Sequence, residues 1–232
     1  SNFQFARQGD LANVADLSSV QLEPLNSAAD TWGILMMKLQ ANLPETLPGQ
    51  NVTFLLFGDV EVRNAADPET HPTLQPMQAF YFSTGITQTD CQSAPADGIL
   101  IQTPQGAGKI HLRANGVDMQ LGSTAFMFAQ PSGIIRVSLL EGRGIVRSDG
   151  RTVVVPAGAQ VEIPLDENLE ANGEPGDPTA YDLDEFHDLP LGVLPDEFDI
   201  HEPATDEELD EAHLESEELD LLDDEFDAEH EG

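Results

Sequence analysis

Histidine and cysteine supply many metal ligands, general bases and nucleophiles; this chain has one cysteine, and its six histidines are scattered. It has one cysteine, Cys91, so neither an internal disulfide nor a cysteine-based metal cluster is possible. His111 stands alone in the apolar run Ile110 to Leu112, with no second histidine nearby. The remaining histidines lie in proline-rich or acidic sequence: His71, His187, His201, His213 and His230. We therefore predict no catalytic residue, no metal ligands, no cofactor and no enzymatic activity.

Serine and glycine motifs point the same way. Ser123 and Ser138 fall in strand-like or turn-like sequence, and neither stands in a Gly-x-Ser-x-Gly elbow. Gly106-Ala-Gly108 precedes a strand-like run, whereas a phosphate-binding loop leads into a helix. Asn51-Val-Thr53 fits a glycosylation sequon but begins a predicted strand. Two interpretations of Cys91 stay open: a free thiol, or a thiol paired with a cysteine upstream or in another chain.

Charge divides the chain into two parts. The 232 residues include 43 Asp and Glu against 9 Lys and Arg, a net charge of −34. From Asp166 to Gly232 there are 28 acidic residues and no Lys or Arg, whereas residues 1–165 hold 15 acidic and all 9 basic residues. Because phosphate binding needs clustered Lys and Arg, we exclude nucleic acid as a ligand. No run of about 18 apolar residues is present, so no membrane span is predicted in this chain.

The acidic tail, residues 204–232, is predicted to be disordered because its charges repel one another. Leu219, Leu222 and Phe226 are spaced for one face of a helix, but acids at i and i+4 make that helix marginal. The tail has two interpretations: a solvating segment, or a weak site for a basic protein partner or for Ca²⁺. It contains no EF-hand loop.

Most of the other segments read as β-strands. Gly108 to Asp166 alternates β-branched runs with Asn-Gly, Pro-Ser-Gly, Glu-Gly and Ser-Asp-Gly turns, which predicts a meander of five or six strands. Further strands are predicted over Asn51 to Val62, Met77 to Ile86 and Gly98 to Pro104. Residues 33–41 fit both a helix and a strand; a hairpin with the following strand would bury both apolar runs and favours the strand.

The predicted fold class is therefore all-β, an antiparallel β-sandwich or β-roll followed by a disordered acidic tail. The apolar residues between Tyr181 and Pro195 are sufficient for that segment to dock on the β part. The predicted organisation, in chain order, is an N-terminal segment (1–30), an N-terminal β region (31–105), a β meander packed with it (106–166), a linker and docking segment (167–203) and the tail (204–232).

One short motif resembles the cupins. Gly150, Pro156 and Gly158 reproduce the spacing of the first half of the second cupin motif. Metal-binding cupins continue with a histidine and an asparagine, and here Val161 and Leu165 stand at those positions. The resemblance therefore implies a turn geometry without the metal site.

A broader resemblance is to the FecR-like domain of bacterial envelope and surface proteins. It is carried by Leu121-Gly-Ser-Thr, by the run Ile135 to Gly144 (IRVSLLEGRG) and by Val153-Val-Val-Pro-Ala-Gly158. Three earlier segments, Gln40 to Val62, Met77 to Phe82 and Gly98 to Gly108, resemble uncharacterised secreted proteins of Chloroflexota-like bacteria that end in such a domain. Together, the two resemblances cover about residues 30–165. This family is all-β, and its members serve in envelope signalling or as parts of secreted proteins, usually without catalysis.

Together, these features favour a non-catalytic, secreted or surface-attached β domain that mediates interaction or assembly. The expected location is extracellular or at the bacterial cell surface, with any signal or anchor upstream of this sequence. Two alternatives stay open: a ligand-binding or enzymatic cupin-like barrel, and a component of envelope signalling.

Overall fold

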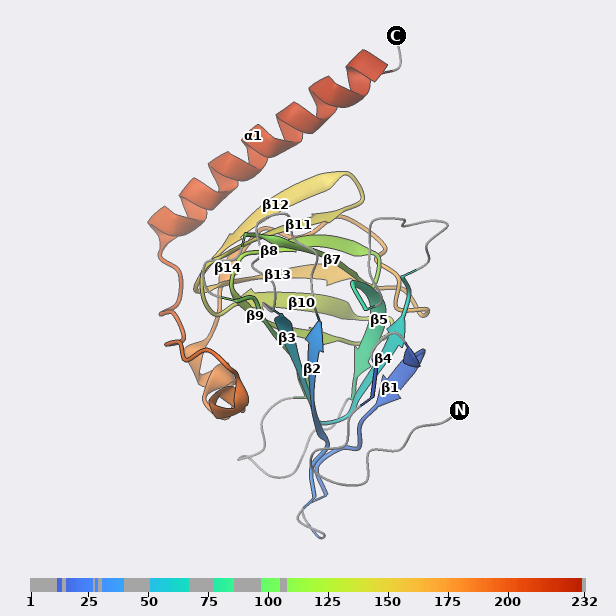
Figure 1. Ribbon diagram of the computed structural model, residues 1–232. Coiled ribbons are helices and arrows are strands. Elements are labelled where there is room, and N and C mark those ends of the chain that lie inside the picture. The colour runs from blue at the N-terminus through green and yellow to red at the C-terminus, as the bar shows by residue number, and fades with distance from the viewer. Residues whose placement is uncertain are drawn as a thin grey trace.

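The chain folds as an all-β sandwich with a helix at its C-terminal end (Figure 1). The computed structural model describes residues 12–13, 16–26, 28, 31–39, 51–66, 77–85, 97–104 and 108–230, with the backbone alone over 222–230. Within this part of the chain, two sheets of seven strands each lie face to face. Neighbouring strands are antiparallel except β5 and β7, which are parallel. The predicted fold class is confirmed.

Sheet I has the spatial order β1-β4-β5-β7-β8-β11-β12. Its neighbouring strands are antiparallel except for β5 and β7, which run parallel over a short register of Ala79 with Arg113 and Phe80 with Ala114. Its strands are β1 (Ser19–Gln21), β4 (Val60–Asn64), β5 (Ala79–Thr84), β7 (Ile110–Ala114), β8 (Val117–Leu121), β11 (Arg143–Ser148) and β12 (Arg151–Pro156).

Sheet II has the spatial order β14-β13-β10-β9-β6-β3-β2. The pairing of β2 with β3 is the hairpin that favoured a strand for residues 33–41, and that prediction is confirmed. The strands are β2 (Ile34–Leu39), β3 (Val52–Phe57), β6 (Gly98–Gln102), β9 (Thr124–Ala129), β10 (Ile134–Leu139), β13 (Ala159–Pro164) and β14 (Thr179–Ala180).

The predicted meander differs from the structure in strand number and connectivity. Residues 108–166 form seven strands, β7 to β13, rather than five or six. Successive hairpins alternate between the two sheets: β7 and β8 lie in sheet I, β9 and β10 in sheet II, and β11 and β12 in sheet I. The turns follow the sequence signals, because Asn115-Gly116 and Asp149-Gly150 both take the positive φ angles of a tight hairpin.

The single strand predicted over residues 51–62 is two strands in different sheets. Gly58 ends β3 with φ +78°, and β4 begins at Val60 in sheet I. A Cβ atom at Gly58 would lie 1.9 Å from Oδ1 of Asp97, so only glycine fits this corner. β-propensity did not show the corner because both halves are rich in β-branched and aromatic residues.

The main core lies between the sheets, and sheet II buries its other face as well. Along β3, Phe54 and Leu56 face the core, whereas Leu55 and Phe57 belong to a second cluster. A continuous apolar run is the expected pattern for a strand buried on both sides. The second cluster is completed by residues of the acidic region: Tyr181, Phe186, Leu189 and Leu194. This segment docks on the sheet, as its apolar composition predicted.

The tail differs from the prediction of disorder over its first part. α1 (Asp206–His230) is helical and packs against β12, with Ala212 and Ser216 buried at the contact. Thr205 and Glu208 form a capping box: Thr205 N–H donates to Glu208 Oε2 at 2.8 Å, and Glu208 N–H donates to Thr205 Oγ1 at 3.4 Å. Helix docking and capping therefore overcome the repulsion on which the prediction of disorder rested.

Candidate functional site

A groove of about 660 Å³ crosses the outer face of sheet I. It runs over β1, β4, β5 and β7 to the β7–β8 turn, on the right-hand side of Figure 1. Arg63, Tyr81 and Arg113 are its most chemically capable side chains among the described residues. A groove of this size is within the usual range of small-ligand sites.

Strand register sets these three side chains on one face of sheet I. Arg63 of β4 pairs with Tyr81 of β5, and Ala79 of β5 pairs with Arg113 of β7. Because side chains alternate along a strand, Ala79 and Tyr81 share a face, and Arg113 lies on that same face. The opposite face carries Phe80 and Phe82 into the core. Sheet I therefore carries both arginines on the same face as Tyr81, on the two strands that flank β5.

Tyr81 is fixed by a carboxylate from a distant segment. Its hydroxyl donates a close hydrogen bond to Glu170 Oε2. Burial, followed by this hydrogen bond and the negative charge of Glu170, raises the pKa of Tyr81 to about 12, although Arg113 and Arg63 oppose the shift. Tyr81 is therefore a neutral, oriented ring at physiological pH.

Glu170 is itself held by a tight turn. Its backbone N–H donates to Asp166 Oδ1 at 2.9 Å, and its carbonyl accepts the N–H of Asp166 at 2.9 Å. The backbone hydrogen bond from Glu170, followed by hydrogen bonds from Asn168, holds the pKa of Asp166 below its usual value. Gly116 makes room for the carboxylate, because a Cβ atom there would lie 2.5 Å from Glu170 Oε1.

Asn115 joins the two halves of sheet I beneath the groove. It is fully buried, and its side-chain amide exchanges hydrogen bonds with the backbone of Phe82: Oδ1 accepts the N–H at 3.2 Å, and Nδ2 donates to the carbonyl at 2.9 Å. Nδ2 also donates to the Leu169 carbonyl at 2.9 Å. The Asn115 side chain therefore supplies hydrogen bonds to β5 beyond the short β5–β7 pairing. It also links the turn that holds Glu170 to sheet I.

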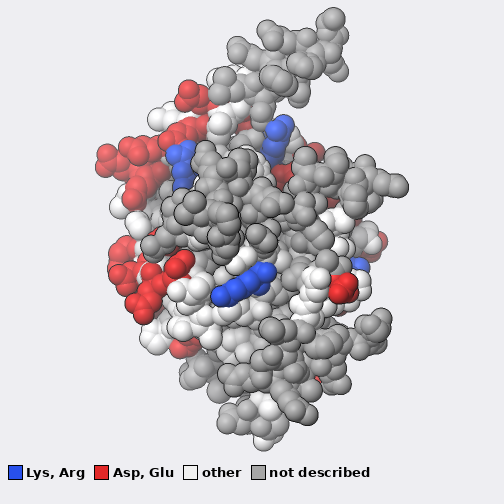
Figure 2. Space-filling model, viewed as in Figure 1, with Lys and Arg blue, Asp and Glu red and all other residues white. Residues whose placement is uncertain are grey.

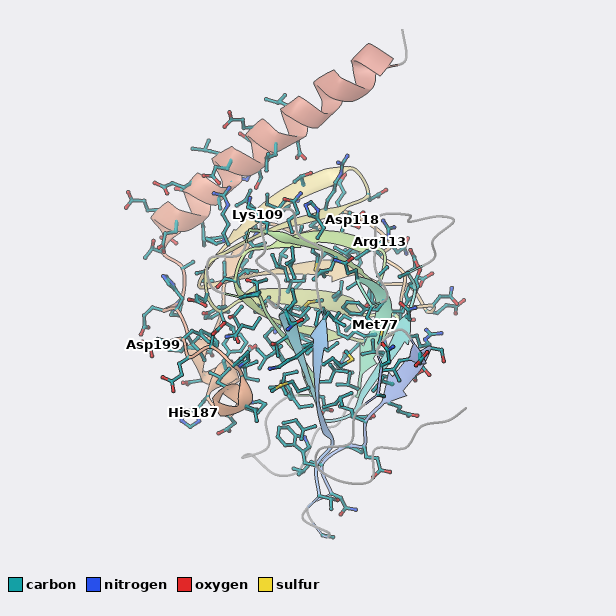
Figure 3. All side chains as sticks on the ribbon, viewed as in Figure 1. Met77, Lys109, Arg113, Asp118, His187 and Asp199 are labelled. Carbon is teal, nitrogen blue, oxygen red and sulfur yellow. The ribbon has the colours of Figure 1, made fainter. Side chains whose placement is uncertain are left out.

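The two arginines keep donors available for a ligand. Arg113 Nη1 lies 2.7 Å from Asp118 Oδ2 (Figure 3 labels both residues), which engages one edge of its guanidinium. Arg63 Nε lies 3.9 Å from Glu61 Oε1, beyond hydrogen-bond distance, and its side chain is about half exposed. A guanidinium has five N–H donors, so each arginine can bind an acidic group while its own carboxylate stays in place.

The residues considered in the sequence for metal binding or nucleophilic chemistry do not converge in the structure. Val161 and Leu165 are buried in the core. His111 is exposed on β7, while Ser123 and Ser138 hydrogen-bond to Glu141 and Gln160 respectively. His187 is exposed beside Asp188 (Figure 3), His201 contacts the carbonyl of Glu202, and His213 lies near Glu217. His71, Cys91, Gly106 and the side chain of His230 lie outside the described part of the chain.

Across the described residues, no group of three or more His, Cys, Asp or Glu is arranged to hold a metal ion. A search of the same residues for a helix with the length and apolar character of a membrane span finds none.

Sequence reasoning missed the groove residues. Arg63, Tyr81 and Arg113 come from three strands, and a parallel pairing across a crossover brings the last beside the other two. The available signal was their alternation with core residues, which placed Tyr81 on the face opposite Phe80. No local spacing links the three positions, so no motif search would find them.

Comparison with known proteins gives no family assignment. No family profile matches the chain, and no curated protein matches it. Two crystal structures of a candidate anti-sigma factor from Parabacteroides distasonis ATCC 8503 are distantly similar. The one at 1.65 Å is 12% identical with a TM-score of 0.41, and the one at 2.50 Å is 13% identical with a TM-score of 0.37. They cover 72% and 64% of this chain, which spans 61% of either neighbour, and a likeness this distant supports no functional argument.

Proposed function

We propose that the protein is a non-catalytic binding module, and that the groove on sheet I binds an acidic saccharide. The observation that carries the proposal is the placement of Arg63 and Arg113 on either side of the oriented Tyr81 ring. Guanidinium groups bind carboxylates through paired hydrogen bonds, and an aromatic ring offers an apolar surface for a sugar face.

The rest of the lining favours a hydroxyl-rich ligand over a purely ionic one. Ser18 and Ser19 of the β1 region and Asn64 of β4 contribute short polar side chains to the groove. Hydroxyl and amide groups donate and accept hydrogen bonds, so they match the hydroxyls of a sugar. The local carboxylates Glu61, Asp118 and Glu170 each face a partner in the protein and leave the remaining guanidinium donors for the ligand.

The broader role that we propose is interaction or assembly at the surface of a bacterial cell or outside it, as part of a FecR-like domain. This extends the resemblance of the strands and turns between Leu121 and Gly158. The sequence encoded upstream tests this part, because a secretion signal or an anchor is expected there. An open reading frame that begins immediately before Ser1, with neither segment, would contradict it.

The ligand proposal is tested by calorimetry with three hexameric probes: oligogalacturonate, a neutral maltooligosaccharide and oligoglutamate. We expect binding of oligogalacturonate, and losses of roughly tenfold to a hundredfold in Arg63→Ala and Arg113→Ala, since a hydrogen bond to a charged group contributes about 1.5–3 kcal/mol. Arg147→Ala, on β11 outside the groove, is the charge-matched control. Equal losses in all three variants, or binding of oligoglutamate alone, would exclude an acidic-saccharide site.

A further inference from the structure

The β12 edge of sheet I is closed by side chains of a helix instead of by another strand. β12 is the last strand of the sheet and pairs with β11 on one side. On the other side, Thr152 N–H donates to Asp220 Oδ1 at 2.8 Å, and Val154 N–H donates to Ser216 Oγ at 2.9 Å. These two backbone donors are the groups through which an edge strand recruits another strand.

The helix matches the edge geometrically. Ser216 and Asp220 are four residues apart, which corresponds to about 6 Å along an α-helix. Val154 and Thr152 are two residues apart, which corresponds to about 6.6 Å along a strand. The helix therefore runs antiparallel to β12 and presents one acceptor to each outward N–H group. The small side chains of Ala212 and Ser216 allow this close approach, and the Ser216 hydroxyl donates to the Ala212 carbonyl at 2.6 Å.

The same helix is weakly attached for its length. Fourteen of its 25 residues are Asp or Glu, and none is Lys or Arg, so its charges repel one another. Leu214 and Leu221 are 64% and 67% exposed and contribute little burial. At the contact itself, Thr152 Oγ1 is buried without a hydrogen-bond partner among the described atoms. Arg143 of sheet I and Glu215 of α1 form an ion pair, but both side chains are about half exposed, so the pair adds little stability.

We propose that α1 is a releasable cover and that the β12 edge beneath it pairs with β12 of a second copy. The four residues Thr152 to Val155 are uncharged and all β-branched, a composition that favours strand addition. Antiparallel pairing centred on Val153 sets Thr152 of one copy opposite Val154 of the other, and their outward N–H and carbonyl groups satisfy each other. The paired strands bring no like charges face to face, and Pro156 limits the length of the pairing.

In the closed state, α1 prevents this pairing in two ways. It occupies the N–H groups of Thr152 and Val154, and its acidic surface repels a second copy that carries the same charge. Figure 2 shows acidic residues over the side of the molecule where α1 and the segment around Asp199 lie. Neutralisation of the helix by a cationic partner therefore favours the paired state. This inference is independent of the groove and its ligand.

Full-length variants test the proposal. Ser216→Lys removes an acceptor and places a bulky charge at a buried contact, so it releases α1. Leu214→Lys makes the same charge change on the exposed side of the same helix and serves as the control. Sedimentation velocity over a concentration series is expected to show a dimer dissociation constant at least roughly tenfold lower for Ser216→Lys than for the wild type or the control.

The second arm identifies the edge. Val154→Pro removes an N–H that faces away from β11, so the pairing within sheet I is preserved. Ser216→Lys combined with Val154→Pro should be monomeric. Faster hydrogen exchange at the amides of Thr152 and Val154 shows that α1 is released in Ser216→Lys. If their exchange is unchanged, Ala212→Lys is added to that variant. The proposal would be overturned if Ser216→Lys released α1 but left the protein monomeric. It would also be overturned if the dimer persisted when Val154→Pro was added.

Discussion

The acidic C-terminal region covers the two sheets by different chemistry. On sheet II, the segment from Tyr181 to Leu194 inserts large apolar side chains, and Phe186 packs edge-on against both Phe126 and Tyr181. On sheet I, α1 attaches through small residues and hydrogen bonds from Ser216 and Asp220 to the edge of β12. Apolar burial is insensitive to salt and to single charges, whereas a hydrogen-bonded polyanionic helix is sensitive to both.

The comparison teaches that acidity alone does not decide whether a segment folds. Both covers are rich in Asp and Glu, but the first places its charges on the outside of an aromatic cluster. Its backbone is also anchored, because Gln102 exchanges hydrogen bonds with Asp196 and the Tyr181 hydroxyl donates to the carbonyl of His201 at 2.7 Å. We therefore expect the sheet II cover to unfold with the whole domain and α1 to open separately.

The largest expected effect is at Phe186. Phe186→Ala removes a ring that is 1% exposed, and cavities of this kind cost about 3–5 kcal/mol of the free energy of unfolding. Urea denaturation followed by tryptophan fluorescence measures the loss, because Trp32 packs against the same cluster. Val193→Ala, in the same segment but 45% exposed, should change stability by less than about 0.5 kcal/mol. A small loss for Phe186→Ala would mean that the segment is not an integral cover.

Asn115 is expected to have the next largest effect, because it supports sheet I itself. Asn115→Ala leaves the buried backbone groups of Phe82 and the Leu169 carbonyl without their partner, and we expect a loss of about 1–3 kcal/mol of the free energy of unfolding. Asp149→Ala is the control, since Asp149 has a similar positive φ in an exposed hairpin turn. Equal losses in chemical denaturation would assign the effect to backbone strain, not to the lost hydrogen bonds.

Much of the fold was predictable from local pattern. Alternation and turn residues located the strands between Gly108 and Asp166, and the apolar residues after Tyr181 indicated docking. The sheet change at Gly58 was missed because the residues on both sides of it are rich in β-branched and aromatic types, which favour one continuous strand. The capping box of Thr205 and Glu208 is a helix signal in the sequence, whereas the prediction of disorder rested on charge repulsion alone. The groove was not predictable because it depends on how three strands pair.

The next prediction concerns ionisation, and the chain has only two tyrosines with which to test it. Burial raises the pKa of both Tyr81 and Tyr181 to about 12, helped by Glu170 at the first and by Glu202 at the second. Below pH 10 both phenols are neutral in either state, and the contribution to stability is lost as pH rises from about 10 towards 12. Phenolate absorbance should therefore appear near pH 12 in the folded protein and near pH 10 in urea.

The variant Tyr81→Phe separates the two sites. It leaves one titrating group on the sheet II cover and removes the hydroxyl that donates to Glu170. Phenolate formation near pH 10 in the folded wild type would contradict the burial of these hydroxyls and the orientation of Tyr81 in the groove.

The smallest expected effect is at the start of α1, where the two covers differ most. Thr205→Ala removes the hydroxyl that accepts Glu208 N–H, and loss of an N-cap costs about 1 kcal/mol of helix stability. Since we expect α1 to open separately from the sandwich, this loss should appear as faster hydrogen exchange at Thr152 and Val154, with an unchanged midpoint of global unfolding. Hydrogen bonds from Thr205, its backbone N–H first, lower the pKa of Glu208, so the stabilisation by the cap is lost as pH falls through that lowered value. Glu208→Gln keeps an acceptor without the charge and should remove this pH dependence while it preserves most of the protection. If Thr205→Ala instead lowers the global midpoint as much as it speeds exchange at β12, then α1 and the sandwich unfold as one unit, and the distinction between a permanent and a releasable cover is wrong.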